Sequence, residues 1–286
     1  MLKYKLTTLS SVKKIGFCFL IYDIINHEEL WYNFFKNIDN QKYNIYIHYK
    51  IDIPLKYFNK YKLDNCIDTK YADISIINAH NTLFKKSYND NCYKIISLSQ
   101  SCIPLKSFNY IYNFLIKNDK GYFSLTSEQC GIFPLCNSLL KYYKSEHLQK
   151  SNNWFILNRD IATKIIVDSV NPTIWKDIWC PEEIYFITTV YKNNMQSKII
   201  QIFDSSSKST TFTNWNNPYF PMNYKYKTKD PGDHPKNYNT IELEEINYLL
   251  IEPCLFGRKF DIYCKILNNK LEYNKLSNYL IQKICK

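Results

Sequence analysis

The chain has 286 residues, of which 45% are hydrophobic and 22% charged, and its net charge is +11. These values are ordinary for a globular protein with a substantial core, organised as one large domain or two small ones. No stretch approaches the roughly 20 consecutive apolar residues of a transmembrane helix, and the scattered Lys and Arg form no dense block, so charge alone does not indicate a nucleic-acid-binding protein.

The first 50 residues predict a β-α-β unit. Residues 14–23 are continuously apolar and aromatic, which predicts a buried strand, and residues 42–50 alternate like a second strand. Between them, residues 26–38 place Leu30, Phe34 and Phe35 on one helical face. This order favours a right-handed crossover between parallel strands.

The next segments continue the alternation of strands and helices. A helix is predicted over residues 71–88, and residues 93–118 predict a strand, a polar loop and a helix after Pro104. Residues 119–153 are rich in loops. Residues 153–170 predict a strand that leads into a helix.

The last third predicts three helices around a long loop. One helix covers residues 181–194 and begins at a proline. Turn formers and aromatics over residues 205–239 predict a long active-site loop. A helix over residues 240–253 opens with an imperfect capping box at Thr240, and an amphipathic helix closes the chain over about 270–286.

Together these elements predict an α/β fold, with a central sheet flanked by helices and ligands at the carboxyl ends of its strands. No repeat or linker divides the sequence, so we expect a single catalytic domain over residues 1–286. The frequent Asn, Ile, Lys and Tyr are typical of an AT-rich genome, such as that of a virus or parasite.

Several common sites are excluded by composition. With five glycines and neither G-x-x-x-x-G-K-[ST] nor G-x-G-x-x-G, the chain has no glycine-rich phosphate loop. None of its ten cysteines forms C-x-x-C or clusters with histidines, so we expect free thiols and no structural zinc. It also has no D-x-D, the pair with which many sugar-nucleotide enzymes hold a divalent ion.

Two short stretches are candidates for a site. Glu182 and Glu183 follow Pro181 in the first turn of a predicted helix. There they either stabilise the helix by ~0.3–1 kcal/mol through its dipole or take part in catalysis. Arg258 and Lys259 stand side by side between phenylalanines, either as an ordinary basic strand edge or as a site for an anion.

Six stretches together resemble the core-2/I-branching family of glycosyltransferases, from about residue 14 to about residue 262. Each is weak alone, but they occur in the family's order and spacing, closest to its plant and microbial branches. They are FLIYD…ELWYNFF…YNIYIHYK, SLSQSCIPL, WFILNRDIA, CPEEIYF, TNWN…HPK and CLFGRKFD.

The resemblance implies a GT-A type fold with a Rossmann-like central sheet. It also implies an enzyme that inverts the anomeric centre and works without a metal ion or other cofactor. The lack of D-x-D agrees with that expectation.

The family's motifs also suggest residues for the acceptor side. Its S-P-D-E motif is similar to residues 180–183, which makes Glu183 the expected catalytic base and Glu182 an acceptor contact. Trp215 matches an aromatic residue that faces the acceptor sugar. The animal acceptor loop has no clear match in residues 119–153, so the acceptor does not follow from the resemblance.

For the donor, the family's L-F-A-N-K-F-D resembles residues 255–261, which suggests Lys259 and its neighbour Arg258 as ligands of the diphosphate. The position of a second cationic residue of the family corresponds to Lys236, where the animal enzymes have Arg. Lys keeps the positive charge but cannot form the two parallel hydrogen bonds of a guanidinium. Leu20 matches a position lining the nucleotide pocket. Lys50 stands there in place of an acidic residue that the animal enzymes have.

The expected function is therefore transfer of a sugar, from UDP-GlcNAc in the first instance, to a hydroxyl of a glycan or glycoprotein. UDP-xylose is an alternative donor, because peptide xylosyltransferases share this domain. A sugar-nucleotide- or glycan-binding protein without turnover is a second hypothesis, and a basic nucleic-acid-binding protein is a third that salt-sensitive DNA binding would favour. Residues 1–25 do not resemble a signal peptide, so the expected location is cytoplasmic or peripheral to membranes.

Overall fold

The structure is a computed structural model that describes residues 12–125, 137–202, 209–215, 225–226, 228, 234–267 and 274–285. A central sheet has the strand order β2-β1-β3-β6-β5-β7. Strand β1 pairs in parallel with both β2 and β3, whereas β6 runs antiparallel to β3. The strands are β1 (Ile15–Ile21), β2 (Tyr43–Tyr49), β3 (Lys94–Ser99), β5 (Gly121–Ser124), β6 (Ile156–Asn158) and β7 (Ile199–Ile202).

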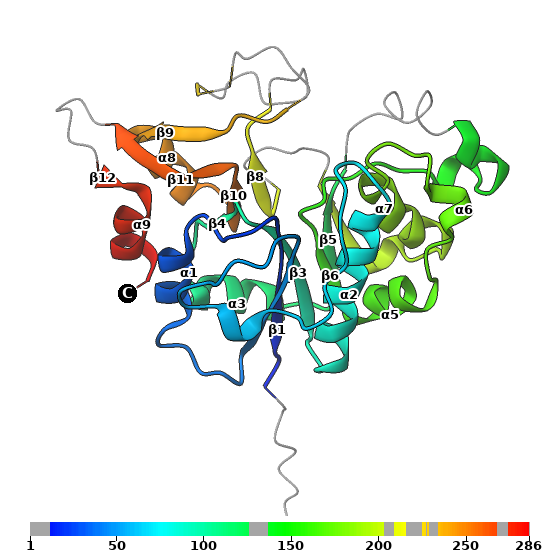
Figure 1. The fold of residues 1–286 in the computed structure, drawn as a ribbon, viewed down its shortest axis with the longest axis horizontal. Coiled ribbons are helices and arrows are strands. Elements are labelled where there is room, and N and C mark those ends of the chain that lie inside the picture. The colour runs from blue at the N-terminus through cyan, green and yellow to red at the C-terminus, as the bar shows by residue number, and fades with distance from the viewer. Residues whose placement is uncertain are drawn as a thin grey trace, which may run out of the picture.

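One face of this sheet is covered by α1 (Glu28–Phe35) and α3 (Phe108–Ile116), seen beside β1 in Figure 1. Aromatic rings fill the layer between them: Phe17 of β1 lies 4.9 Å from Phe35 and 6.1 Å from Phe108, between ring centroids. Helix α3 begins where Ser107 accepts a hydrogen bond from the Tyr110 amide, as a serine N-cap does. Burial of these rings is what holds α1 and α3 to the sheet.

The opposite face carries α2 (Ser75–Asn89), α5 (Arg159–Val167) and α7 (Glu182–Lys192), on the right in Figure 1. Phe155 is fully buried here between Phe84 of α2 and Phe186 of α7, with centroids 5.8 and 5.1 Å away. Because α7 packs by this apolar face, its first turn is fixed relative to the sheet.

The C-terminal third forms two small sheets with a core of their own, at the upper left of Figure 1. Their orders are β4-β10-β8 and β12-β11-β9. The strands are β4 (Ile103–Pro104), β8 (Thr211–Thr213), β9 (Tyr238–Glu242), β10 (Phe256–Arg258), β11 (Phe260–Leu267) and β12 (Asn274–Lys275). Helices α8 (Leu243–Ile251) and α9 (Leu276–Ile284) pack on them.

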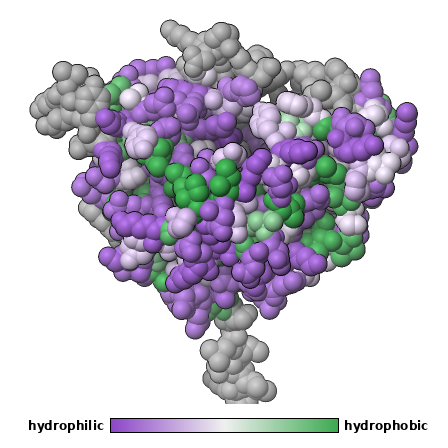
Figure 2. All heavy atoms as spheres, in the orientation of Figure 1, coloured by the Kyte–Doolittle hydropathy of each residue, from purple (hydrophilic) through white to green (hydrophobic). Residues whose placement is uncertain are grey.

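The remaining helices are short. They are α6 (Pro172–Trp175) and the 3-10 helices η1 (Asn59–Tyr61), η3 (Asn137–Lys141), η4 (Ser145–His147) and η5 (Gln196–Lys198). In the described part of the chain no helix is long and apolar enough to cross a membrane. Figure 2 shows a face that is mainly hydrophilic, with separate hydrophobic patches.

The predicted α/β class and the initial parallel β-α-β unit are confirmed. Four local predictions were wrong. Residues 71–74 precede α2, because Asp73 accepts a hydrogen bond from the Ser75 amide and starts the helix only there. Residues 240–242 belong to β9, because they pair with β11 before α8 begins.

The third concerns the predicted loop over residues 205–239, where Thr211–Thr213 pairs with β10 as a strand. Much of the rest of that loop lies outside the described residues, as do residues 270–273 and 286 of the predicted C-terminal helix. The fourth wrong prediction is the start of that helix, because residues 274–275 pair with β11 as β12 and α9 begins only at Leu276. Pro181 is the residue before the first helical turn of α7, close to its predicted place.

Gly121, the first residue of β5, provides a test of this packing. A Cβ there would lie 2.8 Å from the main-chain oxygen of Ile156 in β6. Only a shift of the backbone could relieve so short a contact. We expect Gly121→Ala to lower the free energy of unfolding by about 1–3 kcal/mol, measured by urea denaturation. Lys120→Ala, at the exposed neighbouring position, should change it by less than about 0.5 kcal/mol, and equal effects of the two variants would contradict the explanation.

Candidate functional site

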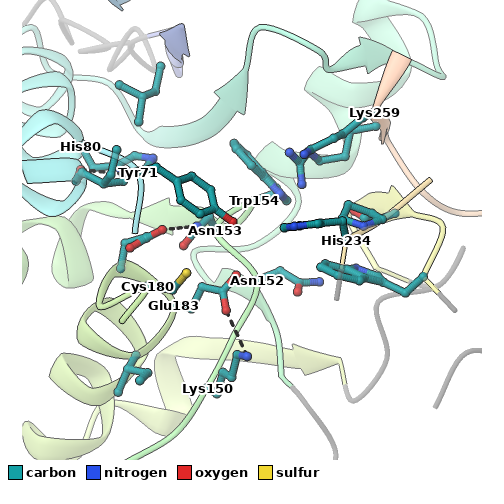
Figure 3. Close-up of a pocket in the computed structure, with 18 of the residues that line it drawn as sticks. Tyr71, His80, Lys150, Asn152, Asn153, Trp154, Cys180, Glu183, His234 and Lys259 are labelled. Atoms are coloured by element: carbon teal, nitrogen blue, oxygen red, sulfur yellow. Dashed lines mark hydrogen bonds and ion pairs between the residues drawn. The ribbon is translucent and has the colours of Figure 1, made fainter. Parts of the chain in front are cut away.

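A cavity of about 830 Å³ lies at the carboxyl end of β1, between the central sheet and the C-terminal sheets (Figure 3). On the side of the sheet it is lined by Leu20 of β1, by Lys150 and residues 152–154 before β6, and by the first turn of α7. Thr213 of β8, Arg258 of β10 and the adjoining Lys259 line the other side. Segments more than 200 residues apart in the sequence therefore meet at this cavity.

Both predicted glutamates of α7 line the cavity. The Glu183 side chain is 24% exposed, and its Oε2 lies 3.2 Å from Nζ of Lys150 (Figure 3). A carboxylate that faces the cavity lies within reach of a hydroxyl bound there. The role of Glu183 as the base stays a prediction.

Glu182 has a different environment from its neighbour. It is only 6% exposed, and its Oε1 accepts a hydrogen bond of 3.2 Å from Nδ2 of Asn153. Its Oε2 is buried without a hydrogen-bond partner among the described residues. Burial, aided by the charge of Glu183, raises the pKa of Glu182 to about 7.

The cationic side of the cavity is formed by Arg258 and Lys259. Arg258 is 9% exposed, and its guanidinium stacks on the ring of Trp154 at 4.1 Å from the ring centroid. Burial lowers the pKa of Arg258 to about 10, and burial together with the charge of Arg258 lowers the pKa of Lys259. Figure 3 shows Lys259 directed to the same part of the cavity as Trp154.

Among the described residues no ion pair joins Arg258 or Lys259 to a carboxylate, and the buried Nε of Arg258 finds no hydrogen-bond acceptor. A buried charge such as that of Arg258 costs free energy when it remains unpaired, and the half-buried Lys259 places a second positive charge beside it. The arrangement therefore suits a ligand that brings at least two negative charges.

A second cavity, of about 540 Å³, adjoins the first. It shares Leu20, His234, Pro235, Arg258 and Lys259 with the first cavity. Its other lining is polar and consists of Asn26, Ser99, Gln100, Ser101, Asn237 and Asp261. The two cations thus lie between a polar compartment and the compartment that holds the glutamates.

Of the other predicted site residues, Leu20 and Trp215 line the first cavity, whereas Lys236 and Lys50 are not among its lining residues. Nζ of Lys236 lies 3.8 Å from the buried Glu245 and above the Tyr238 ring. Nζ of Lys50 donates to the Thr69 carbonyl at 2.5 Å. Their roles in donor binding stay predictions, and neither side chain reaches the cationic side in this structure.

Sequence analysis did not single out four cavity residues: Lys150, Asn153, Trp154 and His234. Lys150, Asn153 and Trp154 precede β6. The sequence from residue 152 is equally compatible with a core strand, and only the short extent of β6 in the structure shows that the residues before it lie at the cavity. His234 begins HPK, which could be an ordinary turn. Among the described residues no three His, Cys, Asp or Glu side chains are grouped so that they could hold a metal ion.

Comparison with known proteins gives the chain a family. The sequence model of the core-2/I-branching enzymes matches residues 15–250, most of the chain. This protein belongs to the core-2/I-branching enzyme family. The resemblance seen in the sequence is thereby confirmed, although the match ends before Arg258 and Lys259.

A curated relative of this core-2/I-branching protein is glycosyltransferase BC10 of Oryza sativa subsp. japonica. It is 20% identical over 262 residues, covering 77% of this chain and 64% of the rice protein. The chain thus spans slightly less than two thirds of that relative.

Two solved structures are similar at 9% identity. One is the apo structure of the bifunctional glycosyltransferase WbbM, with a TM-score of 0.39, covering 71% of this chain and 40% of that one. The other is the galactosyltransferase LgtC in complex with donor and acceptor sugar analogues, with a TM-score of 0.35, covering 94% and 96%. Because both TM-scores are below 0.5, family membership rests on the sequence comparison.

The buried carboxyl of Glu182 predicts a pH-dependent stability. Its pKa rises from 4.5 to about 7 on folding, so ionising it opposes folding, and stability falls as the pH rises from about 4.5 through 7. Glu182→Gln removes this titration. The stability of the variant relative to wild type should therefore increase between pH 5 and pH 8, by about 2–3 kcal/mol, in denaturant unfolding at both pH values.

Glu146→Gln provides the control, because that side chain is 69% exposed. Its stability relative to wild type should be the same at both pH values. A Glu182→Gln variant that behaves like this control would show that Glu182 is ionised in the folded protein across the range.

Proposed function

We propose that this protein is an inverting glycosyltransferase that works without a metal ion. It would move a sugar from a UDP-sugar, with UDP-GlcNAc the expected donor, to a hydroxyl of a glycan or glycoprotein. The observation that carries the proposal is the unpaired cationic pair, Arg258 and Lys259, in one cavity with the Glu183 carboxylate. The family and the name of the rice relative support the reaction class.

The donor would lie across the two cavities. Its diphosphate carries at least two negative charges and would contact Arg258 and Lys259, which lie where the cavities join. The nucleoside would then occupy the polar compartment beside Ser99 and Gln100, and the sugar would enter the compartment of the glutamates. Because Arg258 is already buried and Lys259 half-buried, the two cations need little reorganisation as charge develops on the leaving group.

The acceptor would approach from the side of α7. Glu183 accepts the proton of the acceptor hydroxyl while the hydroxyl oxygen forms a bond to the anomeric carbon. On the opposite side of that carbon, the bond to the diphosphate oxygen breaks and UDP leaves with the electron pair. This in-line displacement inverts the anomeric centre.

Lys150 would hold the base before the acceptor arrives. Its ammonium lies 3.2 Å from Oε2 of Glu183 and keeps the carboxylate turned to the cavity. Glu182, which is buried and bound by Asn153, is a less accessible proton acceptor than its neighbour. The geometry therefore favours Glu183 as the base.

Arg258→Met tests the cationic pair. In the absence of UDP it should raise the free energy of unfolding by about 1 kcal/mol or more, because an unpaired buried charge is replaced by an apolar chain of similar size. UDP affinity, measured by calorimetry in buffer with excess EDTA, should fall about 10- to 100-fold. Lys259→Ala should also weaken UDP binding. It should reduce turnover through a loss of about 2–4 kcal/mol of transition-state stabilisation.

Arg159→Met is the matched control for Arg258. Arg159 also stacks on an aromatic ring, at 4.2 Å from the centroid of Tyr88, but its guanidinium donates to the carbonyls of Tyr88 and Cys92. Its replacement should lower stability and leave UDP affinity unchanged. Wild-type activity that is lost in EDTA and restored by manganese would refute the metal-free mechanism.

Glu183→Gln tests the chemical step. It keeps the size of the side chain but removes its basicity, so turnover should fall about 10²–10⁴-fold while UDP-sugar binding remains within about twofold. The assay is release of UDP from UDP-GlcNAc, UDP-xylose and other UDP-sugars in the presence of glycan acceptors.

Glu182→Gln is the comparison, since it alters the neighbouring carboxyl. A larger loss of turnover in Glu182→Gln than in Glu183→Gln would assign the base to Glu182. Binding of UDP-sugars without UDP release from any of them by wild type would favour a sugar-nucleotide-binding protein instead.

A further inference from the structure

Two aromatic side chains at the mouth of the first cavity have no role in the reaction described above. Tyr71 is 72% exposed and Trp179 is 57% exposed, yet both line the cavity that contains Glu183. Their ring centroids are 5.8 Å apart and the ring planes are inclined by 77°. We call this pair the aromatic lip.

The two loops that carry the lip are joined by a main-chain hydrogen bond. The amide of Cys180, directly after Trp179, donates a hydrogen bond of 3.3 Å to the carbonyl of Ala72, directly after Tyr71. Both Ala72 and Cys180 have positive φ angles, 55° and 49°, which is uncommon for residues other than glycine. Such backbone persists where the surrounding structure holds it, so the lip is a fixed feature of the cavity mouth.

The lip is on the acceptor side of the proposed reaction. Tyr71 and Trp179 line the cavity of the glutamates but not the polar compartment on the other side of the two cations. Figure 3 shows the Tyr71 hydroxyl pointing into the cavity toward Asn153. Partial burial raises the pKa of Tyr71, and the charges of Cys180, Glu183 and Glu182 add to the rise, in agreement with this closeness.

We propose that the aromatic lip binds the sugar ring next to the one that carries the reacting hydroxyl, so that the enzyme prefers acceptors of two or more rings. Aromatic faces pack on the apolar C–H faces of sugars, while the Tyr71 hydroxyl can hydrogen-bond a sugar hydroxyl. The exposure of both rings leaves room for such a ligand, and their position beyond Glu183 places it outside the reacting ring. This inference rests on the proposed function and adds the class of acceptor to it.

The test compares one-ring and two-ring acceptors of the same chemistry. The probes are methyl β-galactoside with methyl β-lactoside, xylose with xylobiose, and N-acetylglucosamine with chitobiose. Wild type should have a higher kcat/KM for the two-ring member of the pair that it uses. In Trp179→Ala and Tyr71→Ala, KM for the two-ring acceptor should rise about 3- to 10-fold more than KM for the one-ring acceptor.

Two further variants separate the lip from general effects on folding. Trp179→Tyr keeps an aromatic face and should recover most of the two-ring preference. Tyr263→Ala removes a ring that is equally exposed, at 74%, but lies on β11 away from the cavity, and it should change neither KM. Equal rises in both KM values, no rise, or a rise only in KM for the donor would overturn the proposal.

The lip can also be tested apart from turnover. Saturation-transfer NMR with the same two-ring sugars, in the presence of UDP, measures binding without reaction. If wild type releases no UDP with any donor, the proposed function fails, and the NMR arm still decides on the lip. Two-ring binding that Trp179→Ala weakens would support it, whereas absent or unchanged binding would overturn it.

Discussion

The burial of Arg258, beside the half-buried Lys259, is the constraint on which the site depends. Arg258 and Lys259 are held because the residues around them are anchored: Phe256 and Phe260 are fully buried, and β10 pairs with both β4 and β8. Gly257 packs so closely that a Cβ would lie 3.1 Å from Leu105. Since no ion pair among the described residues joins either cation to a carboxylate, the free protein keeps an electrostatic cost that an anionic ligand relieves.

The central sheet supplies the other half of the site through its strand directions. Strands β1 and β3 are parallel, so Leu20 and Ser99 emerge at the same edge, next to the C-terminal sheets. On the far face, the packing of Phe186 against Phe155 sets the position of α7 and hence of its first-turn glutamates. The hydrophobic layers thus determine the distance between the carboxylates and the cations.

The local residue patterns of the sequence predicted many of these strands, helices and site residues, but not all of them. The strands 14–23 and 42–50, the helix start at Glu182 and the basic pair at 258–259 were visible because each is a short contiguous signal. Lys150, Trp154 and the lip were not, because their role comes from tertiary neighbours that no spacing reveals. The family motif also assigned Lys236 to the diphosphate. In the structure its ammonium lies 3.8 Å from the buried Glu245, and Lys236 does not line the cavity.

The distribution of the site along the chain has a consequence for its biosynthesis. The proposed base is on α7, while the cations lie at the end of β10 and just after it, in a part of the fold whose core includes α8 and α9. His27, just before α1, contacts Ser277 of α9 at 2.8 Å. A nascent chain can assemble the first parallel strands early, but it has no complete pocket until the last third has emerged and folded. Truncated products would therefore be inert, and catalytic activity would report that the entire chain has reached its native state.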